Sequence, residues 1–446
     1  MKTILSNQHE NFVNAAVEDT PPLINTDAPS VPTLFRSYKY PVSSWPVVID
    51  KKIAERLSHL STRIPQLISK IPALYFDNNE QKIADYYLDG NTTLAQFAIL
   101  SHKKNVSASC RLDLTYTEDG FKVLEANIGS SVGGWQVQSF EKIIKQYHPL
   151  LKTDFESKNV QELYYEFLVK KVIEHVSDIQ NEVNIFITMD EIGDENSKQE
   201  ILEFLNHLLK ETLHKRNFTG QIFIGKLTEL KLLGGKICLD NKRIHSVLNM
   251  NREEITPSIF RAFMMDLIYF PDHLGIELER DKRNLGLLRE LAEQNKLSPE
   301  DKALVLEAIP WTYAVENRQV TYNDEEYNLL ELLKNNKDKF VIKAAVGYQG
   351  VDVFVGKFLS DESWEDAIAF GVKEKKFIAQ EFSDSLSIMA PDTQNKWSEH
   401  KIIWGSFGFG EVYGGVWVRM SAVKTDVGVI NSATGAVEAI VYESAV

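Results

Sequence analysis

Four polar side chains on two neighbouring segments of the chain have the types and the spacing of a phosphate and metal site. They are Arg111, Asp113, Glu125 and Asn127. Polar and apolar residues alternate through 109–127 around a short loop, which predicts a β-hairpin. If the loop has three residues, Asp113 faces Glu125, Arg111 faces Asn127, and all four side chains share one face of the hairpin.

The chemistry of this face suits a divalent cation and a phosphate. Two carboxylates and an amide oxygen are hard ligands that Mg²⁺ prefers, and the planar fork of Arg111 matches a phosphate. In an equally simple alternative, Arg111 neutralises the two acids on a solvated surface. The polar loop Ile128–Trp135 favours the site, because such a loop beside metal ligands is where a substrate would be met. The opposite face of the hairpin is apolar and expected to face the core: Leu112, Leu114, Tyr116, Leu124 and Ala126.

A second candidate region is a lysine in an apolar strand, followed by a turn with glycines. Lys343 interrupts the run Phe340–Ala345 and needs either an anionic partner or a path to the surface. The turn that follows contains Gly347, Gln349 and Gly350, and its backbone amides could fold over phosphates. Alternatively, these glycines are needed only for the backbone conformation of the turn and bind no phosphate.

Four further residues are weaker candidates. Lys282 opens a predicted helix within a mixed-charge stretch, where a solvated face is the plain alternative. Gln380 and Glu381 end an apolar strand whose backbone could pair with an adenine edge, although an ordinary core strand has the same pattern. Arg419 follows a pair of glycines on a predicted strand and could clamp a phosphate.

The elements that must position these residues indicate a mixed α/β protein. Helical spacing of apolar residues covers 49–102 and 140–176, and Ser298 with Pro299 marks a further helix start. The region 182–225 alternates strand, helix and strand, a hairpin is expected over 236–249, and the C-terminal part is rich in strands. The predicted divisions are an extended arm (1–33), a helical region with the hairpin (34–150), a small α/β region (151–255) and a nucleotide-binding domain (256–446).

Bulk composition excludes some classes of function. The chain has 446 residues and a formal charge of −14, which disfavours a nucleic-acid or anionic-membrane binder. Two cysteines are too few for a disulfide framework, and no apolar run is long enough for a signal peptide or a membrane span. We therefore expect a cytoplasmic protein with no nucleic-acid or membrane partner.

Taken in order, these pieces resemble the circularly permuted ATP-grasp ligases, the family that includes the synthetase domain of glutathionylspermidine synthetase. The Arg-x-Asp and Glu-x-Asn pair of the hairpin is the most specific match. The other matching stretches are Asp281-Lys282, Ile309–Thr312, Val341–Gly350, Ala379–Glu381 and Gly414–Arg419. Permutation of the chain would account for metal ligands that precede the lysines.

The resemblance implies a role for each candidate residue. Asp113, Glu125 and Asn127 would bind Mg²⁺, and Lys282 and Lys343 would hold the phosphates of ATP. Arg111 would steady the transferred phosphoryl group, with Arg419 as a second catalytic arginine. The remaining nucleotide-binding residues would be Gly347, Gln349, Gly350, Gln380 and Glu381. The α/β region would be a small pre-ATP-grasp-like domain.

The implied activity is ATP- and Mg²⁺-dependent formation of an amide from a carboxylate and an amine, through an acyl phosphate. The substrates would be small molecules or peptides. Two alternatives remain open at this level. The same site could transfer phosphate to a small acceptor without ligation, or the glycine-poor turn could indicate a nucleotide-binding module without catalysis.

Overall fold

One mixed sheet forms the centre of the molecule. The computed structural model describes residues 2–15, 20–36, 38–152, 155–189, 195–347, 352–392, 394, 396–425, 428–432 and 435–444. The central sheet has eight strands in the order β1-β20-β19-β18-β2-β3, with β17 beside β18 and β4 beside β20. Its strands are β1 (Val47–Ile49), β2 (Ser109–Thr117), β3 (Gly120–Ile128), β4 (Phe155–Glu156), β17 (Ser387–Pro391), β18 (Trp397–Phe409), β19 (Val412–Ala422) and β20 (Val437–Ser444). The predicted hairpin, β2 and β3, therefore lies at one edge beside strands from the C-terminal part.

The hairpin has the predicted site pairs but a different turn. Thr117 pairs with Gly120, so the loop has two residues rather than three. The register then shifts beyond Asp113, where Leu124 is inserted in β3 as a β-bulge. The two differences cancel, and Asp113 still faces Glu125. Leu124 does not join the core as expected; Val123 does, while Leu124 lines the cavity described below.

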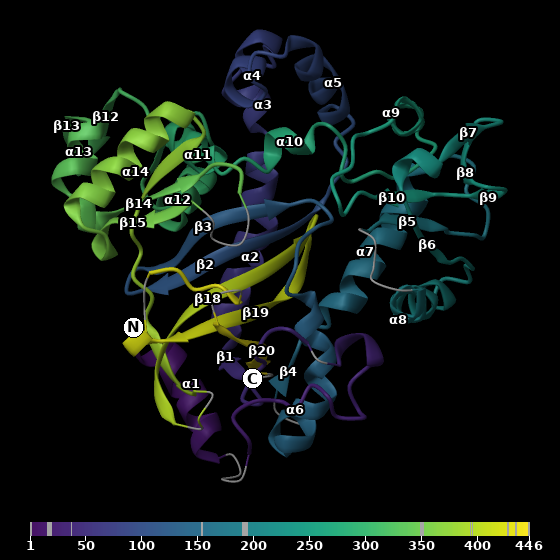
Figure 1. The fold of residues 1–446 in the computed structure, drawn as a ribbon, viewed down its shortest axis with the longest axis horizontal. Helices are drawn as coiled ribbons and strands as arrows, with labels where there is room; N and C mark the ends of the chain where they lie inside the picture. Colours follow the sequence, from purple (N-terminus) through teal and green to yellow (C-terminus); the bar gives the residue numbers. More distant parts are fainter. Residues whose placement is uncertain are drawn as a thin grey trace.

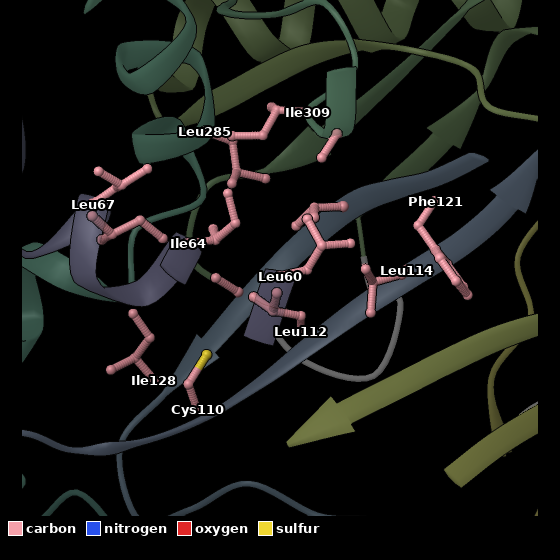
Figure 2. Packing of buried hydrophobic residues seen from close by; sticks show 14 of the residues in the cluster. Leu60, Ile64, Leu67, Cys110, Leu112, Leu114, Phe121, Ile128, Leu285 and Ile309 are labelled. Atoms are coloured by element: carbon pink, nitrogen blue, oxygen red, sulfur yellow. The ribbon is translucent and has the colours of Figure 1, made fainter. Parts of the chain in front are cut away.

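Helices cover the apolar face of the central sheet. Asp50 caps α2 by accepting a hydrogen bond from the backbone N–H of Ile53, and the buried residues of α2 recur at helical spacing. Figure 2 shows Leu60 and Ile64 of α2 packed with Leu112 and Leu114 of the hairpin. The helices of this layer are α2 (Lys51–Ile68), α3 (Ile71–Leu74), α4 (Glu80–Tyr87), α5 (Thr92–His102), α10 (Ile276–Glu279), α11 (Arg283–Glu293) and α12 (Pro299–Ala308). Ser298 caps α12 and Pro299 is its first residue, as predicted.

A smaller sheet lies over the other face of the hairpin. Its order is β11-β16-β14-β15, and all neighbours are antiparallel. Its strands are β11 (Thr312–Ala314), β14 (Phe340–Ala344), β15 (Val353–Val355) and β16 (Phe377–Glu381). Helices α13 (Leu329–Asn335) and α14 (Asp361–Glu374) pack on it, beside the hairpin of β12 (Gln319–Tyr322) and β13 (Glu325–Asn328). Figure 1 shows this unit on one side of the central sheet.

The middle of the chain forms a separate α/β layer on the opposite side (Figure 1). Three parallel strands, in the order β10-β5-β6, pack with helices around one core. The elements of this layer are α7 (Val160–His175), β5 (Ile185–Thr188), α8 (Glu195–His214), β6 (Ile222–Gly225), β7 (Lys231–Leu233), β8 (Lys236–Leu239), β9 (Lys242–Arg243), β10 (Ser246–Leu248) and α9 (Pro257–Met264). The hairpin expected over 236–249 forms only in part: β8 pairs with the short β9, which lies in the expected turn, whereas the expected second arm, 244–249, contains β10 and joins the parallel sheet.

The N-terminal segment is not an extended arm. Lys2–Ala15 forms helix α1, and Phe12, Ile24, Val31 and Phe35 are buried in a core shared with α6 (Glu141–Tyr147) and α7. The prolines of this segment do not prevent packing, because its apolar side chains are buried against residues of the central sheet such as Ile440 and Tyr442. No helix in the described ranges combines the length and apolar character needed to cross a membrane.

Candidate active site

A cavity of about 580 Å³ lies between the hairpin and the smaller sheet. Every predicted site residue that the structure describes lines it: Arg111, Asp113, Glu125, Asn127, Lys282, Lys343, Gly347, Gln380, Glu381 and Arg419. The other two predicted residues, Gln349 and Gly350, lie outside the described residues. Residues up to 308 positions apart in the sequence thus meet in one place.

Asp113 is held by two arginines at the centre of the cavity. Arg111 donates from Nε to Oδ1 at 2.7 Å and from Nη2 to Oδ2 at 3.1 Å, and Arg419 donates from Nη2 to Oδ2 at 2.6 Å. Burial opposes ionisation of Asp113, but the charges of Arg111 and Arg419 outweigh it and hold the pKa of this carboxyl below its ordinary value. Asp113 is therefore an ionised partner of both guanidinium groups.

A tryptophan supports the two arginines. The guanidinium carbons of Arg111 and Arg419 lie 5.9 and 5.4 Å from the ring centroid of Trp417. Arg111 also donates from Nη1 to the carbonyl of Gly133 at 2.8 Å, which ties it to the predicted substrate loop. Gly134 has φ +97°, and a Cβ there would lie 2.2 Å from Trp417. The loop can approach the tryptophan only because this residue is glycine.

Glu125 and Asn127 sit beside this group on β3. Asn127 donates from Nδ2 to Glu125 Oε1 at 3.0 Å, and Lys282 Nζ lies 3.4 Å from Glu125 Oε2. Lys282 also donates to the carbonyl of Gly347 at 3.2 Å, and its backbone N–H donates to the carbonyl of Ala345 at 3.0 Å. The start of α11 is thereby fixed to the end of β14, with the lysine directed at the hairpin.

Lys343 contacts the bulge of the hairpin. Its Nζ donates to the carbonyl of Leu124 at 2.7 Å and to Gln380 Oε1 at 2.9 Å. The pKa of Lys343 is lowered to about 8, mainly by burial and also by Lys282, against the opposing effects of Glu125 and Asp113. The β-bulge therefore serves the site directly, because it turns a strand carbonyl toward the lysine.

Gln380 and Glu381 end β16 at the cavity wall. Gln380 donates from Nε2 to Thr312 Oγ1 at 3.0 Å, and Tyr322 donates its hydroxyl to Glu381 Oε1 at 2.8 Å. The backbone N–H groups at Glu381 and Phe382 already donate to the carbonyls of Trp311 and Lys339. These bonds fix the end of the strand and leave its side chains at the cavity.

The charges lining the cavity suit a polyanion accompanied by a cation. Seven basic and five acidic side chains line it, in a chain whose formal charge is −14. Glu125 and Asn127 retain free oxygen lone pairs and fit a Mg²⁺ ion that takes its other ligands from phosphate and water. Asp113 could also coordinate the ion, but only when Arg111 and Arg419 bind another anion in its place. Within the described ranges, no group of three or more His, Cys, Asp or Glu residues forms a metal site by itself.

Several residues of the cavity escape sequence reasoning. Tyr38 and Tyr40 come from the N-terminal segment, Arg252 from the loop after β10 and Glu438 from β20, and Arg280 directly follows α10. Neither spacing nor a motif marks them, because their elements meet the cavity only through tertiary packing. Of these five residues, Arg252 is the one with an unusual backbone conformation: its φ is +54°, which is rare for a residue with a side chain.

Comparisons with known proteins connect the chain to solved structures alone. No family model and no curated protein matches it. A glutathione synthetase-like effector from Globodera pallida, solved in its apo form, aligns with a TM-score of 0.55 and 11% identity, over 99% of this chain and 98% of that one. At this identity the match establishes a shared fold over the whole described chain.

Two further solved structures align more loosely. A putative gamma-glutamylcysteine synthetase from Methylobacillus flagellatus has a TM-score of 0.42 and 13% identity over 85% of this chain and 88% of that one. A D-alanyl-alanine synthetase A from Vibrio cholerae has a TM-score of 0.24 and 11% identity over 51% and 68%. Neither match is close enough to support an argument about this protein.

Proposed function

We propose that this protein is an ATP- and Mg²⁺-dependent ligase that joins a carboxylate to an amine and releases ADP and phosphate. The observation that carries the proposal is the convergence of Arg111, Arg419, Lys282 and Lys343 with Glu125 in one cavity. Support comes also from the fold, which is shared with a glutathione synthetase-like protein. We further propose that the two sheets form an ATP-grasp arrangement in permuted order, with the nucleotide between β16 and the hairpin.

The reaction would proceed in two balanced steps. A carboxylate oxygen of the first substrate attacks the γ-phosphorus of ATP, and the bond between that phosphorus and the bridging oxygen breaks to release ADP. The amine nitrogen then attacks the acyl carbon, the C–N bond forms, and the C–O bond breaks as phosphate leaves. The attacking amine is neutral and loses one proton as the amide forms, and an amine that binds as an ammonium ion first gives up one proton to solvent.

The side chains of the cavity would act by position and charge. Lys282 and Lys343 hold the phosphates of ATP, and Arg111 and Arg419 neutralise the charge on the transferred phosphoryl group. Glu125 and Asn127 would hold Mg²⁺, which supplies charge neutralisation to phosphate oxygens when bound. The cavity orients the reactants, so no nucleophilic side chain is required.

Release of ADP tests the proposal. Purified protein is incubated with ATP, Mg²⁺ and mixtures of small carboxylates and amines, and the products are identified by mass spectrometry. A ligase yields ADP, phosphate and an amide, and Glu125→Ala reduces turnover by at least a hundredfold because Mg²⁺ and Lys282 lose their shared partner. A control, Glu141→Gln, alters a half-buried carboxylate outside the cavity and keeps full turnover.

The result distinguishes the proposal from its rivals. A phosphorylated acceptor in place of an amide would assign phosphotransfer. ATP binding without ADP release from any mixture would assign a nucleotide-binding module. Turnover that survives Glu125→Ala would remove Glu125 from the reaction.

A further inference from the structure

A buried acid lies at the end of the cavity away from the lysines. Glu438 on β20 is 2% exposed and lines the cavity. It pairs in register with Arg419 on β19, so the two side chains lie side by side on the same face of the sheet. The strand order then places Glu125 and its lysine at β3, Asp113 at β2, Arg419 at β19 and Glu438 beyond them at β20.

The two hydrogen bonds that the Glu438 carboxyl accepts in the described part of the chain come from uncharged hydroxyl groups. Ser432 donates its hydroxyl to Oε1 at 2.6 Å, and Tyr38 donates its hydroxyl to Oε2 at 3.0 Å. Among the ion pairs of the described residues, none involves Glu438, although Arg419 and Arg111 act on it from a distance. Arg419 is its cross-strand neighbour but does not pair with it in the described structure, so a substrate cation could supply the direct ion pair that this buried carboxyl lacks.

Aromatic rings stand beside this acid. Tyr38 and Tyr40 both line the cavity, with ring centroids 5.7 Å apart and planes at 83°. The ammonium group of Lys39 lies 5.5 Å from the ring centroid of Tyr40, so this ring already accepts a cation, and an ammonium substrate would have to displace Lys39 from it. An acid and two electron-rich rings together form a site for a positively charged group.

We propose that Glu438, Tyr38 and Tyr40 bind the amine substrate as a primary ammonium ion. This proposal rests on the ligase activity proposed above and names the position of its second substrate. The phosphates of ATP are held at the β3 side by Lys282 and Lys343, whereas the amine enters at the β20 side. The arginines on Asp113 lie between them, where the acyl group would form.

Binding of simple amines to the full chain tests this site without ATP. Isothermal titration uses three ammonium probes, ethanolamine, 1,4-diaminobutane and glycine, with the neutral 1,4-butanediol as a comparison. At least one ammonium probe should bind, the diol should not, and Glu438→Gln should weaken binding by at least tenfold. Tyr40→Leu should weaken it by about two- to fivefold, the range of an exposed cation–π contact.

A control variant separates loss of charge in the cavity from loss of a hydrogen-bonded, half-buried carboxyl elsewhere, one that pairs with Lys145. Glu141 also accepts hydrogen bonds from a serine and a tyrosine, Ser157 and Tyr442, but lies outside the cavity. Glu141→Gln should leave the affinity for the ammonium probe within twofold of the wild type. If Glu438→Gln does not fold, Tyr40→Leu decides alone, and an unchanged affinity overturns the proposal.

The outcomes separate this proposal from the ligase assignment. Failure of all three ammonium probes to bind, or equal binding by wild type and Glu438→Gln, overturns the amine site. ADP release that requires an amine would still support the ligase in that case. Conversely, ammonium binding that depends on Glu438, with no ADP release from any mixture, would support the amine site and contradict the ligase assignment.

Discussion

At the scale of residues, Asp113, Arg111 and Arg419 form an ion cluster at the centre of the cavity, and an anion that binds there must change its pairing. Asp113 takes three hydrogen bonds from two guanidinium groups that a phosphate would also attract. The same carboxylate is therefore a counter-ion without substrate and is available as a metal ligand once the arginines turn to phosphate. Lys343 differs from Asp113, because burial and not a neighbouring charge has the largest effect on its pKa.

The pKa of Lys343 predicts how ATP use depends on pH. Because burial lowers this pKa to about 8, the ammonium form predominates below pH 8 and is lost progressively above it. The kcat/KM for ATP should therefore fall about tenfold for each pH unit above pH 8. Lys343→Arg, which stays charged, should remove this decline even if its activity is lower. A wild-type profile that is flat to pH 10 would contradict the prediction.

Removing the charge of Asp113 should destabilise the protein in a way that an anion repairs. Asp113→Asn leaves two buried arginines without a counter-ion and should cost about 3–5 kcal/mol in the free energy of unfolding. Inorganic sulfate should restore more stability to this variant than to the wild type in urea titrations. Asp281→Asn breaks another buried pair, with Arg283, away from the cavity, and sulfate should not rescue it.

At the scale of elements, some features could be predicted from the sequence and others could not. Alternation along the hairpin was sufficient to pair Asp113 with Glu125, yet it did not reveal the two-residue turn or the bulge at Leu124. The bulged carbonyl accepts a hydrogen bond from Lys343, more than two hundred residues away, and alternation along the hairpin cannot reveal such a contact. Helix caps such as Ser298 were predictable because they act locally. The role of Glu438 was not predictable, since it depends on Tyr38 in the N-terminal segment and Arg419 on β19.

Two glycines with the same φ offer a test of the loop that carries Gly133. Gly120 and Gly134 both have φ +97°, but a Cβ at Gly120 meets nothing within 4 Å, whereas one at Gly134 meets Trp417 at 2.2 Å. Gly120→Ala should cost about 1–2 kcal/mol, the backbone strain alone. Gly134→Ala should cost more and reduce ADP release at least tenfold, because it displaces the ring beneath the arginines. Equal losses in the two variants, measured by urea unfolding and turnover, would refute this role.

At the scale of the whole molecule, segments from both ends of the chain complete the central sheet and its cavity. The N-terminal segment supplies Tyr38 and covers a core that includes Phe140 and Trp45. The smaller sheet supplies Lys343, and the middle layer reaches the cavity through Arg252. No single region contains the site, so stability and function depend on the same long-range contacts.

Deleting residues 1–33 should destabilise the protein substantially. Phe12, Ile24 and Val31 are buried there, and each such side chain contributes about 1.5–3 kcal/mol. The loss should therefore be at least about 4 kcal/mol and should appear as a lower urea midpoint. As a comparison, Leu233→Ser changes a half-exposed side chain of β7 and should shift the midpoint little. An unchanged midpoint after the deletion would mean that this segment does not pack in solution.

The parallel pairing of β1 with β20 also bears on how the protein is made. Val47 pairs with Val441, and Asp113 meets Arg419, so neither the sheet nor the cavity can close until nearly the whole chain has left the ribosome. The edge of β2 stays unpaired during that time, because its neighbour β18 comes from the C-terminal part. Shortened translation products would thus expose the unpaired backbone edge of β2, which can pair with other chains, and they would lack Arg419.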